Sequence, residues 1–561
     1  MINLIEKTKD EIASVIKRGV EKAGLAEFGA PIEIEKPRDE GHGDFSTNIA
    51  MRLAKPAKSN PRALAEKLIG EFETEGTVIE SVETAGPGFI NFTLKPERLY
   101  EVMKVIEDEG EDYGRVNIGG GKKTMVEFIS SNPTGPMHVG NARGGAIGDC
   151  LASILDYAGF DVTREFYVND AGNQIERFGM SLEARYYQLI GREVEFPEDG
   201  YHGEDITQLM RDYIAEHGDG DKDAPDLREK LVAYGLEKNI KCIKDTMKDF
   251  GINYDVWFLE SELHKSGEVK AAVKELIDKG WTYEKDGAIW LKSSEFYCTK
   301  DDEEAKDDVL VRSNGIPTYF AADIAYHRNK FVTRGFDTVI DVWGADHHGH
   351  TIRMKGAMDA IGIDPERLRF VLMQLVRLIR GGEVVKVSKR TGKAVTLNEL
   401  LDDIGADAVR FFFNMRQPAS HFDCDLDLAV SKTSDNPVYY VQYAHARMCS
   451  ILKMLEAEGV SVPKFSDVNC ALLNTAQEKA LLKKLEEFPQ EITDAALSYE
   501  PSKITRYAID LASAFHTFYN ADRVKVDDKE LMRARLLLVN SARLALKSTL
   551  RVLGVTAPEK M

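Results

Sequence analysis

The sequence predicts an α/β fold in three parts: a central domain with a parallel sheet, a smaller N-terminal α/β domain and an all-α C-terminal domain. Between residues 122 and 380, short apolar runs alternate with longer amphipathic segments, as strands and helices do around a parallel sheet. From residue 436 to the end the pattern is helical almost throughout. A stretch rich in glycine and polar residues, 110–121, separates the first part from the second.

Length and composition are those of a large globular chain. The 561 residues are 43 % hydrophobic and 30 % charged, enough for three or four domains. No apolar run approaches the roughly 20 residues of a membrane helix, and the amphipathic N-terminus lacks a signal-peptide core, so we expect a cytoplasmic protein with no membrane contact. Six cysteines without a CxxC pair argue against a disulfide scaffold or a zinc ribbon. The net charge of −20 argues against general nucleic-acid binding, although residues 501–551 are locally basic.

The N-terminal domain, residues 1–115, begins with an amphipathic helix. We then expect a short strand at Pro31–Glu35, helices from Asn48 and over Pro61–Phe72, paired strands at Val78–Glu83 and Phe89–Leu94, and a helix over Pro96–Asp108. His42 lies in a glycine loop, where a histidine that stabilises the turn is expected. Nothing in this domain has the pattern of a catalytic centre.

The central domain opens with the stretch that organises the chain, EFISSNPTGPMHVGN at 127–141. A strand over Met125–Ile129 ends in a polar turn, and a helix over Ala142–Leu155 follows. In an α/β sheet, nucleotides bind in the crevice at the carboxyl ends of the strands. A helix start suits a phosphate, and Gly140 removes a side chain where a flat base could lie. An isolated HxG is nevertheless a weak signal.

The remainder of the central domain alternates strands and helices. We predict strands at 162–168, 256–258, 288–291, 339–344 and 370–379, and helices at 174–189, 227–250, 268–279 and 351–361. Residues 191–226 are acidic and rich in glycine, which indicates an insertion over the sheet. Helices from Asn398 and over Ala406–Met415 lead to four C-terminal helices at 439–458, 471–488, 501–521 and 529–553.

A second motif, KVSKR at 386–390, lies in a loop with glycines on both sides. Lys386 and Lys389 could close over a polyphosphate and neutralise developing charge, although alone the loop could equally be a solvated basic segment.

Together these motifs resemble those of class I aminoacyl-tRNA synthetases, and specifically the arginyl-tRNA synthetase family. SNPTGPMHVGN matches the nucleotide-binding signature, and KVSKR matches the second signature with Val where Met is usual. The resemblance extends over almost the whole chain, through YFAADIAYH, VWGADHH, DAVRFFF and DNPVYYVQYAHARMCSIL. It implies a Rossmann-like catalytic domain at 120–380 with an insertion around 191–260, a signature-loop and connecting helical region at 381–435, and a helical anticodon-binding domain at 436–561.

The resemblance implies an arginine–tRNA ligase. Arginine and ATP would form arginyl-adenylate and pyrophosphate, with Mg²⁺ neutralising phosphates, and arginine would pass to the 3′-terminal adenosine of tRNA(Arg). The implied catalytic residues are His138, Asn141, Lys386 and Lys389, and the ATP-binding set adds Pro136, Gly140 and Ser388. The family's first motif commonly ends in His, whereas this chain has Asn141, which donates a hydrogen bond but carries no imidazolium charge. No metal ligands are expected on the protein.

Selection of arginine requires acids, because carboxylates match the planar fork of a guanidinium. Asp323, with Tyr319 one turn earlier, is the first candidate, and Glu127 is the second. The resemblance supports both and adds Ser131, Asn132 and Asn141 around the α-amino and carboxylate groups. Asp346 and His347 are also expected in the arginine pocket, with His350 near its wall.

In the C-terminal domain, Tyr439, Tyr443 and Arg447 are the predicted tRNA-binding residues, because aromatic rings stack on unpaired bases and Arg contacts phosphates. Some of the tyrosines in this helix must be core residues. The N-terminal domain resembles the family's added domain, which grips the tRNA elbow. We expect a monomer whose partners are tRNA(Arg), L-arginine and ATP.

Three other functions compete with the ligase. A catalytically inactive tRNA-binding paralogue would keep the fold and lose the chemistry. A nucleotidyltransferase acting on a small substrate would have no use for the long helical C-terminus. A metal hydrolase at ADHHGH, 345–350, would bind zinc through its His and Asp residues.

Overall fold

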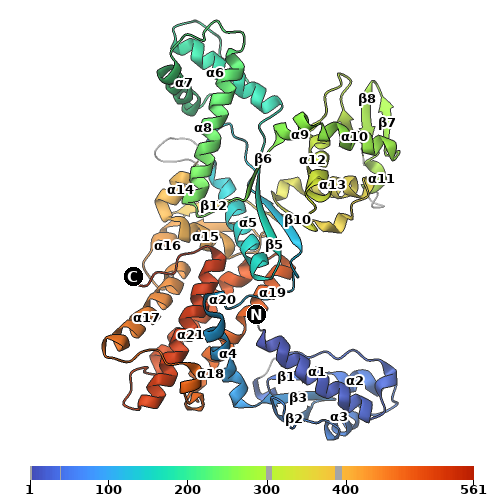
Figure 1. The fold of residues 1–561 in the computed structure, drawn as a ribbon, viewed down its shortest axis with the longest axis vertical. Coiled ribbons are helices and arrows are strands. Elements are labelled where there is room, and N and C mark those ends of the chain that lie inside the picture. The colour runs from blue at the N-terminus through green and yellow to red at the C-terminus, as the bar shows by residue number, and fades with distance from the viewer. Residues whose placement is uncertain (1–2, 38–39, 298–305, 386–394) are drawn as a thin grey trace.

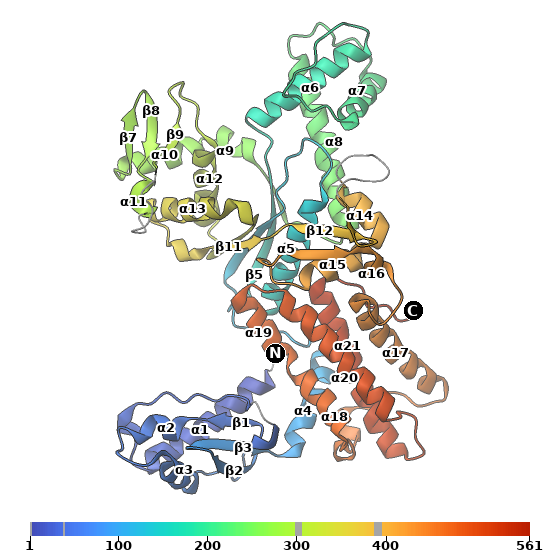
Figure 2. The ribbon, with the colours of Figure 1, turned by 180° about the vertical axis from the view of Figure 1, so that it is seen from behind.

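The computed structural model describes residues 3–37, 40–297, 306–385 and 395–561. Figures 1 and 2 show a central sheet with helical layers around it, an N-terminal domain at one end and a helical insertion at the other. The C-terminal helices lie between the sheet and the N-terminal domain.

The N-terminal domain packs helices on a three-stranded antiparallel sheet of order β1-β3-β2. Its elements are α1 (Leu4–Lys22), β1 (Phe45–Thr47), α2 (Ile49–Ala54), α3 (Pro61–Gly70), β2 (Ile79–Ala85) and β3 (Phe89–Leu94). The predicted pairing of the last two strands is confirmed. The predicted strand over Pro31–Glu35 is wrong: only Glu35 pairs, in an isolated bridge to Ser46, because the rest of this segment has no neighbouring strand.

Helix α4 (Pro96–Glu109) belongs by packing to the C-terminal helices. Its buried side chains Val102, Met103 and Ile106 share one core with that domain, whereas the N-terminal sheet has a core of its own. The Tyr100 hydroxyl donates to the carbonyl of Leu473 at 3.1 Å. We therefore propose that the boundary of the N-terminal domain lies near residue 95.

The central sheet has five parallel strands in the order β11-β10-β4-β5-β6, which confirms the predicted parallel sheet. The strands are β4 (Lys123–Phe128), β5 (Asp161–Val168), β6 (Val256–Leu259), β10 (Thr338–Gly344) and β11 (Leu368–Met373). The chain runs from β4 outward to β6 and then returns to β10 on the other side of β4. The order thus reverses between β4 and β10, the position at which sheets of this class bind ligands.

Two insertions rise above the carboxyl ends of these strands (Figure 1). The first is helical: α6 (Asn173–Leu189), α7 (Glu204–His217) and α8 (Leu227–Asp249). The second surrounds a small antiparallel sheet of order β7-β8-β9. It contains α9 (Glu260–Ser266), α10 (Glu268–Asp278), β7 (Thr282–Lys285), β8 (Ala288–Leu291), α11 (Ser294–Tyr297), β9 (Asp308–Val311), α12 (Tyr319–Arg328) and α13 (His348–Ala360). The sequence indicated only one of its three strands.

After β11 the chain forms a small connecting unit. Its elements are β12 (Val376–Arg380), β13 (Glu383–Val384), α14 (Leu397–Ile404), α15 (Ala406–Asn414), β14 (Phe422–Asp425) and α16 (Leu426–Val430). The single strand predicted over 370–379 is two strands, interrupted at Gln374 and Leu375, and they belong to different sheets.

The C-terminal domain is all-α, as predicted: residues 437–561, all of them described, contain no strand. Its helices are α17 (Pro437–Ala457), α18 (Ala476–Glu486), α19 (Phe488–Ser498), α20 (Ser502–Ala521) and α21 (Lys529–Leu553). They bury one face each against a common apolar core that continues into the central domain. Among the described residues, no helix is long and apolar enough to cross a membrane.

Candidate active site

The turn after β4 is held in an unusual backbone conformation. Ile129 and Ser130 have φ values of +69° and +46°, in the left-handed region that a β-branched residue rarely adopts. The Ser130 hydroxyl donates to Glu127 at 2.8 Å and accepts from the backbone N–H of Tyr167 at 3.2 Å, which fixes the turn. Beyond it, the Ser131 hydroxyl is buried with no hydrogen-bond partner in the described part of the chain. A buried hydroxyl of this kind is free to bind a ligand.

Helix α5 (Val139–Tyr157) begins at the other end of this turn, with His138 at its N-cap. The His138 side chain is exposed and makes no capping bond to the described backbone, so its imidazole is available. Among the described residues, a Cβ on Gly140 would meet only Leu375, at 3.9 Å, so the described chain leaves space over this turn. By contrast, a Cβ on Gly148 would lie 2.2 Å from Phe128, so this glycine is what lets α5 approach β4 closely.

The segment that follows the second motif lies directly beside the first. Lys386, Ser388 and Lys389 lie outside the described residues. The chain resumes at Val395, whose carbonyl accepts from the N–H of Val139 at 3.1 Å. The N–H of Leu397 donates to the carbonyl of Met137 at 2.9 Å, and Thr396 bridges His138. Two stretches that are distant in sequence thus meet at the start of α5.

Asp323 and Tyr319 project from α12 at the carboxyl side of the sheet. The Asp323 carboxylate, 36 % exposed, lies 3.1 Å from Nε2 of His350. Nδ1 of His350 accepts from Arg353 at 3.3 Å, so Nε2 carries the proton and donates it to Asp323. The Tyr319 hydroxyl accepts from the N–H of Asn173 at 3.2 Å, which closes this side of the crevice.

The sequence analysis missed Glu260, a second acid in this crevice. It begins α9 directly after β6, and only 3 % of it is exposed. Burial raises its pKa and the negative charge of Asp323 adds to the effect, while hydrogen bonds from Tyr167 and His264 oppose it. Glu260 and Tyr319 both line a cavity of about 370 Å³. The position of Glu260, just after the carboxyl end of a predicted strand, was the signal in the sequence that could have identified it.

Three further predicted arginine ligands lie apart from this pair of acids. Glu127 is 5 % exposed, and its carboxylate is 2.5 Å from the Lys330 ammonium; its contact with arginine stays a prediction. Asp346 and His347 have side chains 82 % and 56 % exposed and pair only with each other, at 3.7 Å, among the described residues. Both lie at the rim, because they precede the first turn of α13, where the described residues leave most of each side chain exposed. Asn132 is exposed and Asn141 half-buried, at the two ends of the signature turn.

The described residues contain no group of three or more His, Cys, Asp or Glu side chains placed to hold a metal ion. In ADHHGH, His350 is already engaged by Asp323 and Arg353. The geometry therefore gives no support to a zinc hydrolase at this motif.

The predicted tRNA-binding residues form one stack on α17. The rings of Tyr439 and Tyr443 lie 6.0 Å apart and nearly parallel, at 7°. The guanidinium of Arg447 lies over the rings of Tyr443 and Tyr519, at 5.3 and 4.5 Å. All three predicted residues are half-buried, so each leaves part of its surface to solvent.

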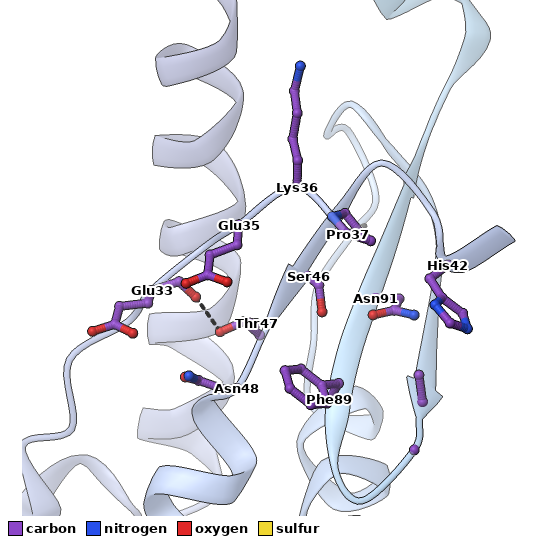
Figure 3. Close-up of a pocket in the computed structure, with 12 residues that line it drawn as sticks. Glu33, Glu35, Lys36, Pro37, His42, Ser46, Thr47, Asn48, Phe89 and Asn91 are labelled. Atoms are coloured by element: carbon purple, nitrogen blue, oxygen red, sulfur yellow. Dashed lines mark hydrogen bonds between the residues drawn. The ribbon is translucent and has the colours of Figure 1, made fainter. Parts of the chain in front are cut away.

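A second cavity, of about 430 Å³, lies in the N-terminal domain (Figure 3). Phe89 and Asn91 face it from β3, and His42 lies at its edge, in the loop before β1. The acids Glu33 and Glu35 lie on the opposite side. The lining combines an exposed ring, an amide, the acids Glu33 and Glu35, and the basic Lys36.

Comparison with known proteins covers the whole chain. Three family models match: "Arginyl tRNA synthetase N terminal domain" at 10–94, "tRNA synthetases class I (R), catalytic domain" at 102–418, and "DALR anticodon binding domain" at 441–561. Curated relatives named arginine–tRNA ligase include those of Caldanaerobacter subterraneus subsp. tengcongensis, 56 % identical, and Acetivibrio thermocellus, 55 % identical. Each comparison covers 100 % of both chains.

Solved structures resemble the fold. A putative arginyl-tRNA synthetase from Campylobacter jejuni has a TM-score of 0.75 and 31 % identity, covering 83 % of this chain and 100 % of its own. The Thermus thermophilus arginyl-tRNA synthetase has a TM-score of 0.73 and 22 % identity, covering 98 % and 99 %. This second likeness concerns the fold alone.

Proposed function

The chain belongs to the arginyl-tRNA synthetase family, and we propose that arginine and ATP meet in the crevice above β4 and β10. The chain is an arginine–tRNA ligase: it activates L-arginine with ATP to arginyl-adenylate and transfers the arginyl group to the 3′-terminal adenosine of tRNA(Arg). The observation that carries the site assignment is the pair of acids Asp323 and Glu260. No Lys or Arg of the described chain lies within ion-pair distance of either one.

These two acids would select the substrate. A guanidinium presents donors in a rigid planar fork, and carboxylates on two sides can receive it. The ionised form of Glu260 is disfavoured in the empty pocket by burial, so a cation supplied by substrate restores the balance. Tyr319 would cover the aliphatic part of arginine. Ser131 and Asn132 would receive its α-amino and carboxylate groups, since the Ser131 hydroxyl is buried without a partner.

ATP would lie across the start of α5. The open face of Gly140 and the exposed Leu375 suit adenine, and the positive end of the α5 helix dipole suits phosphate. Pro136, His138 and Asn141 lie along the same turn. Lys386, Ser388 and Lys389 would approach from the second motif, since Val395, which follows that motif, is hydrogen-bonded to Val139.

Mg²⁺ would enter with ATP. The described residues provide no cluster of acids to hold it, and Mg²⁺ commonly retains waters and binds substrate phosphates rather than a protein cage. Its contribution when bound is to neutralise phosphate charge.

The first reaction is an in-line displacement. A carboxylate oxygen of arginine forms a bond to the α-phosphorus, the bond to the bridging oxygen breaks, and pyrophosphate leaves with its electrons. The protein's part is positioning and charge stabilisation. His138 and the two lysines would face the developing charge, and Asn141 would donate a hydrogen bond without adding charge.

The tRNA would contact both the C-terminal and the N-terminal domain. The stacked face of Tyr439, Tyr443 and Arg447 offers rings for unpaired bases and a cation for phosphate. The cavity beside Phe89 and Asn91 would receive one further base. Because one chain carries the motifs, the acids and both tRNA-facing surfaces, we propose that it acts as a monomer, in the cytoplasm.

Formation of arginyl-tRNA tests the proposal. Purified protein with tRNA, ATP and labelled arginine should form arginyl-tRNA, whereas citrulline, which replaces the guanidinium with a neutral group of similar shape, should not react. An inactive tRNA-binding paralogue would bind tRNA and form no product. Acceptance of citrulline at a similar rate would contradict selection by the two acids.

A further inference from the structure

Three carboxylates lie in a row across the middle of the central sheet. Asp341 of β10 is paired in register with Glu127 of β4, which is in turn paired with Glu165 of β5. Residues opposite one another on parallel strands point to the same face, so the three side chains are neighbours. All three are buried. Such a row is unfavourable unless cations are placed against it.

One helical segment supplies the cations. His327 lies one turn after Asp323 on α12. Lys330 lies in the π-helical turn that follows, Asn329–Thr333, and Arg334 comes directly after that turn. The Lys330 ammonium lies 2.9 Å from Asp341 and 2.5 Å from Glu127. Arg334 donates to both oxygens of Glu165. Burial acts to lower the pKa of Lys330, but the acids beside it outweigh burial and raise it.

His327 is held between two acceptors. Its Nδ1 lies 2.8 Å from the backbone carbonyl of Asp323, and its Nε2 lies 2.8 Å from the carboxylate of Asp341. A carbonyl only accepts. Burial acts to raise the pKa of Asp341, but Lys330 and His327 lower it to about 2, so this carboxylate is ionised and also only accepts. Both ring nitrogens must therefore donate, which makes His327 an imidazolium. Three cations then balance three carboxylates.

The other groups around His327 do not change this assignment. The rings of Tyr326 and Trp343 lie 5.6 and 6.4 Å from its ring centre, and neither carries charge. The Asp323 carboxylate itself points to His350. The cation Lys330 shares Asp341 with His327, on the other carboxylate oxygen.

The row touches the active site at two places. At one end, His327 holds the backbone of Asp323. In the middle, Glu127 accepts from the Ser130 hydroxyl, immediately before the unpartnered Ser131. The same buried network thus joins the helix that bears the arginine-selecting acid to the turn that bears the nucleotide signature.

We propose that His327 is a positioning residue for arginine selection: as an imidazolium between Asp341 and the Asp323 carbonyl, it sets Asp323 relative to the signature turn. This inference rests on the proposed arginine pocket. If the network had a purely structural role, removing one of its partners would lower the stability of the fold and would impair arginine and ATP alike, without singling out one substrate.

His327→Gln is the test variant, since Gln keeps much of the size but cannot donate in two opposite directions. In arginyl-tRNA formation, we expect the KM for arginine to rise on the order of tenfold, the cost of losing a charge-assisted hydrogen bond. The KM for ATP should change less than about twofold. Asp341→Asn, which removes the charge at constant shape, should act in the same direction and provides a second variant if the first fails to fold.

His445→Gln is the matched control, because His445 is equally buried, bonds a backbone carbonyl at 2.9 Å and has its pKa lowered by burial. It should leave the KM for arginine unchanged. Nitrogen-15 histidine spectra should show two proton-bearing ring nitrogens for His327, in signals absent from the His327→Gln protein.

The inference is overturned if both network variants keep the wild-type KM for arginine, if they raise the two KM values equally, or if His327 shows one ring proton. Asp323→Asn in the same assay separates the possibilities. If Asp323→Asn has no effect on arginine, the pocket itself is wrong. If it impairs arginine and the network variants do not, only the role of His327 is wrong.

Discussion

Replacing Asp323 by Asn removes one negative charge from the proposed arginine pocket and almost nothing else. Asn has the same shape and can still accept the hydrogen bond that His350 donates at 3.1 Å. The backbone carbonyl of Asp323, held by His327, is unaffected. The change therefore isolates the interaction between the carboxylate and a guanidinium.

The size of the effect follows from the exposure of this carboxylate. A hydrogen bond to a charged group contributes about 1.5–3 kcal/mol, and a guanidinium can make two to one carboxylate. Because the Asp323 side chain is 36 % exposed, solvent screens part of this interaction energy, and we take about 2–4 kcal/mol for the two hydrogen bonds together. At 1.4 kcal/mol per tenfold, arginine binding should weaken roughly 30- to 1,000-fold.

Calorimetric titration with arginine, and separately with ATP, measures this directly. Arginine affinity should fall by that factor while ATP affinity stays within about twofold. Asp359→Asn, an exposed acid near the far end of α13, is the matched control and should change neither. Arginine affinity within about threefold of wild type in folded Asp323→Asn protein would refute the reasoning, because a selecting carboxylate cannot be lost at so small a cost.

Three further variants probe other parts of the account. Lys389→Ala should slow adenylate formation about 100-fold in single-turnover kinetics, which is the scale of losing one charge-stabilising group. A change below about threefold would show that Lys389 does not stabilise the transition state. Glu260→Gln should raise the Tm of the arginine-free protein at pH 8. This gain in Tm should shrink as the pH falls toward the ordinary carboxyl pKa of 4.5. Burial raises the pKa of Glu260, so at low pH its side chain is neutral, as Gln is at every pH. A gain in Tm that does not change with pH would contradict an origin in the buried charge. Tyr443→Ala should weaken tRNA binding in filter assays by about 1–3 kcal/mol and leave the KM for arginine unchanged, whereas equal losses in both would point to misfolding.

Local signals in the sequence were sufficient for the sheet and the signature turn. The strand, turn and helix around His138 were predictable because apolar periodicity, Pro and Gly act within a few residues of one another. Tyr319 and Asp323 were predictable as a pair because four residues span one helical turn.

What could not be predicted depends on contacts between distant residues. The sequence at Glu127 shows an acid at the end of a strand, and nothing nearby indicates that Lys330 neutralises it. Asp346 and His347 directly follow β10, yet their side chains lie at the rim, because no described element covers the start of α13. The break at Gln374 is set by which sheet each half joins, and one polar residue in a mostly apolar run does not reveal that change.

A structure of the protein with arginine and a non-hydrolysable ATP analogue tests the central claim most directly. The account predicts the guanidinium within hydrogen-bond distance of Asp323 and Glu260, and the α-phosphate beside the start of α5 near His138. A guanidinium bound at the rim by Asp346, or one in the crevice that contacts neither Asp323 nor Glu260, would contradict it.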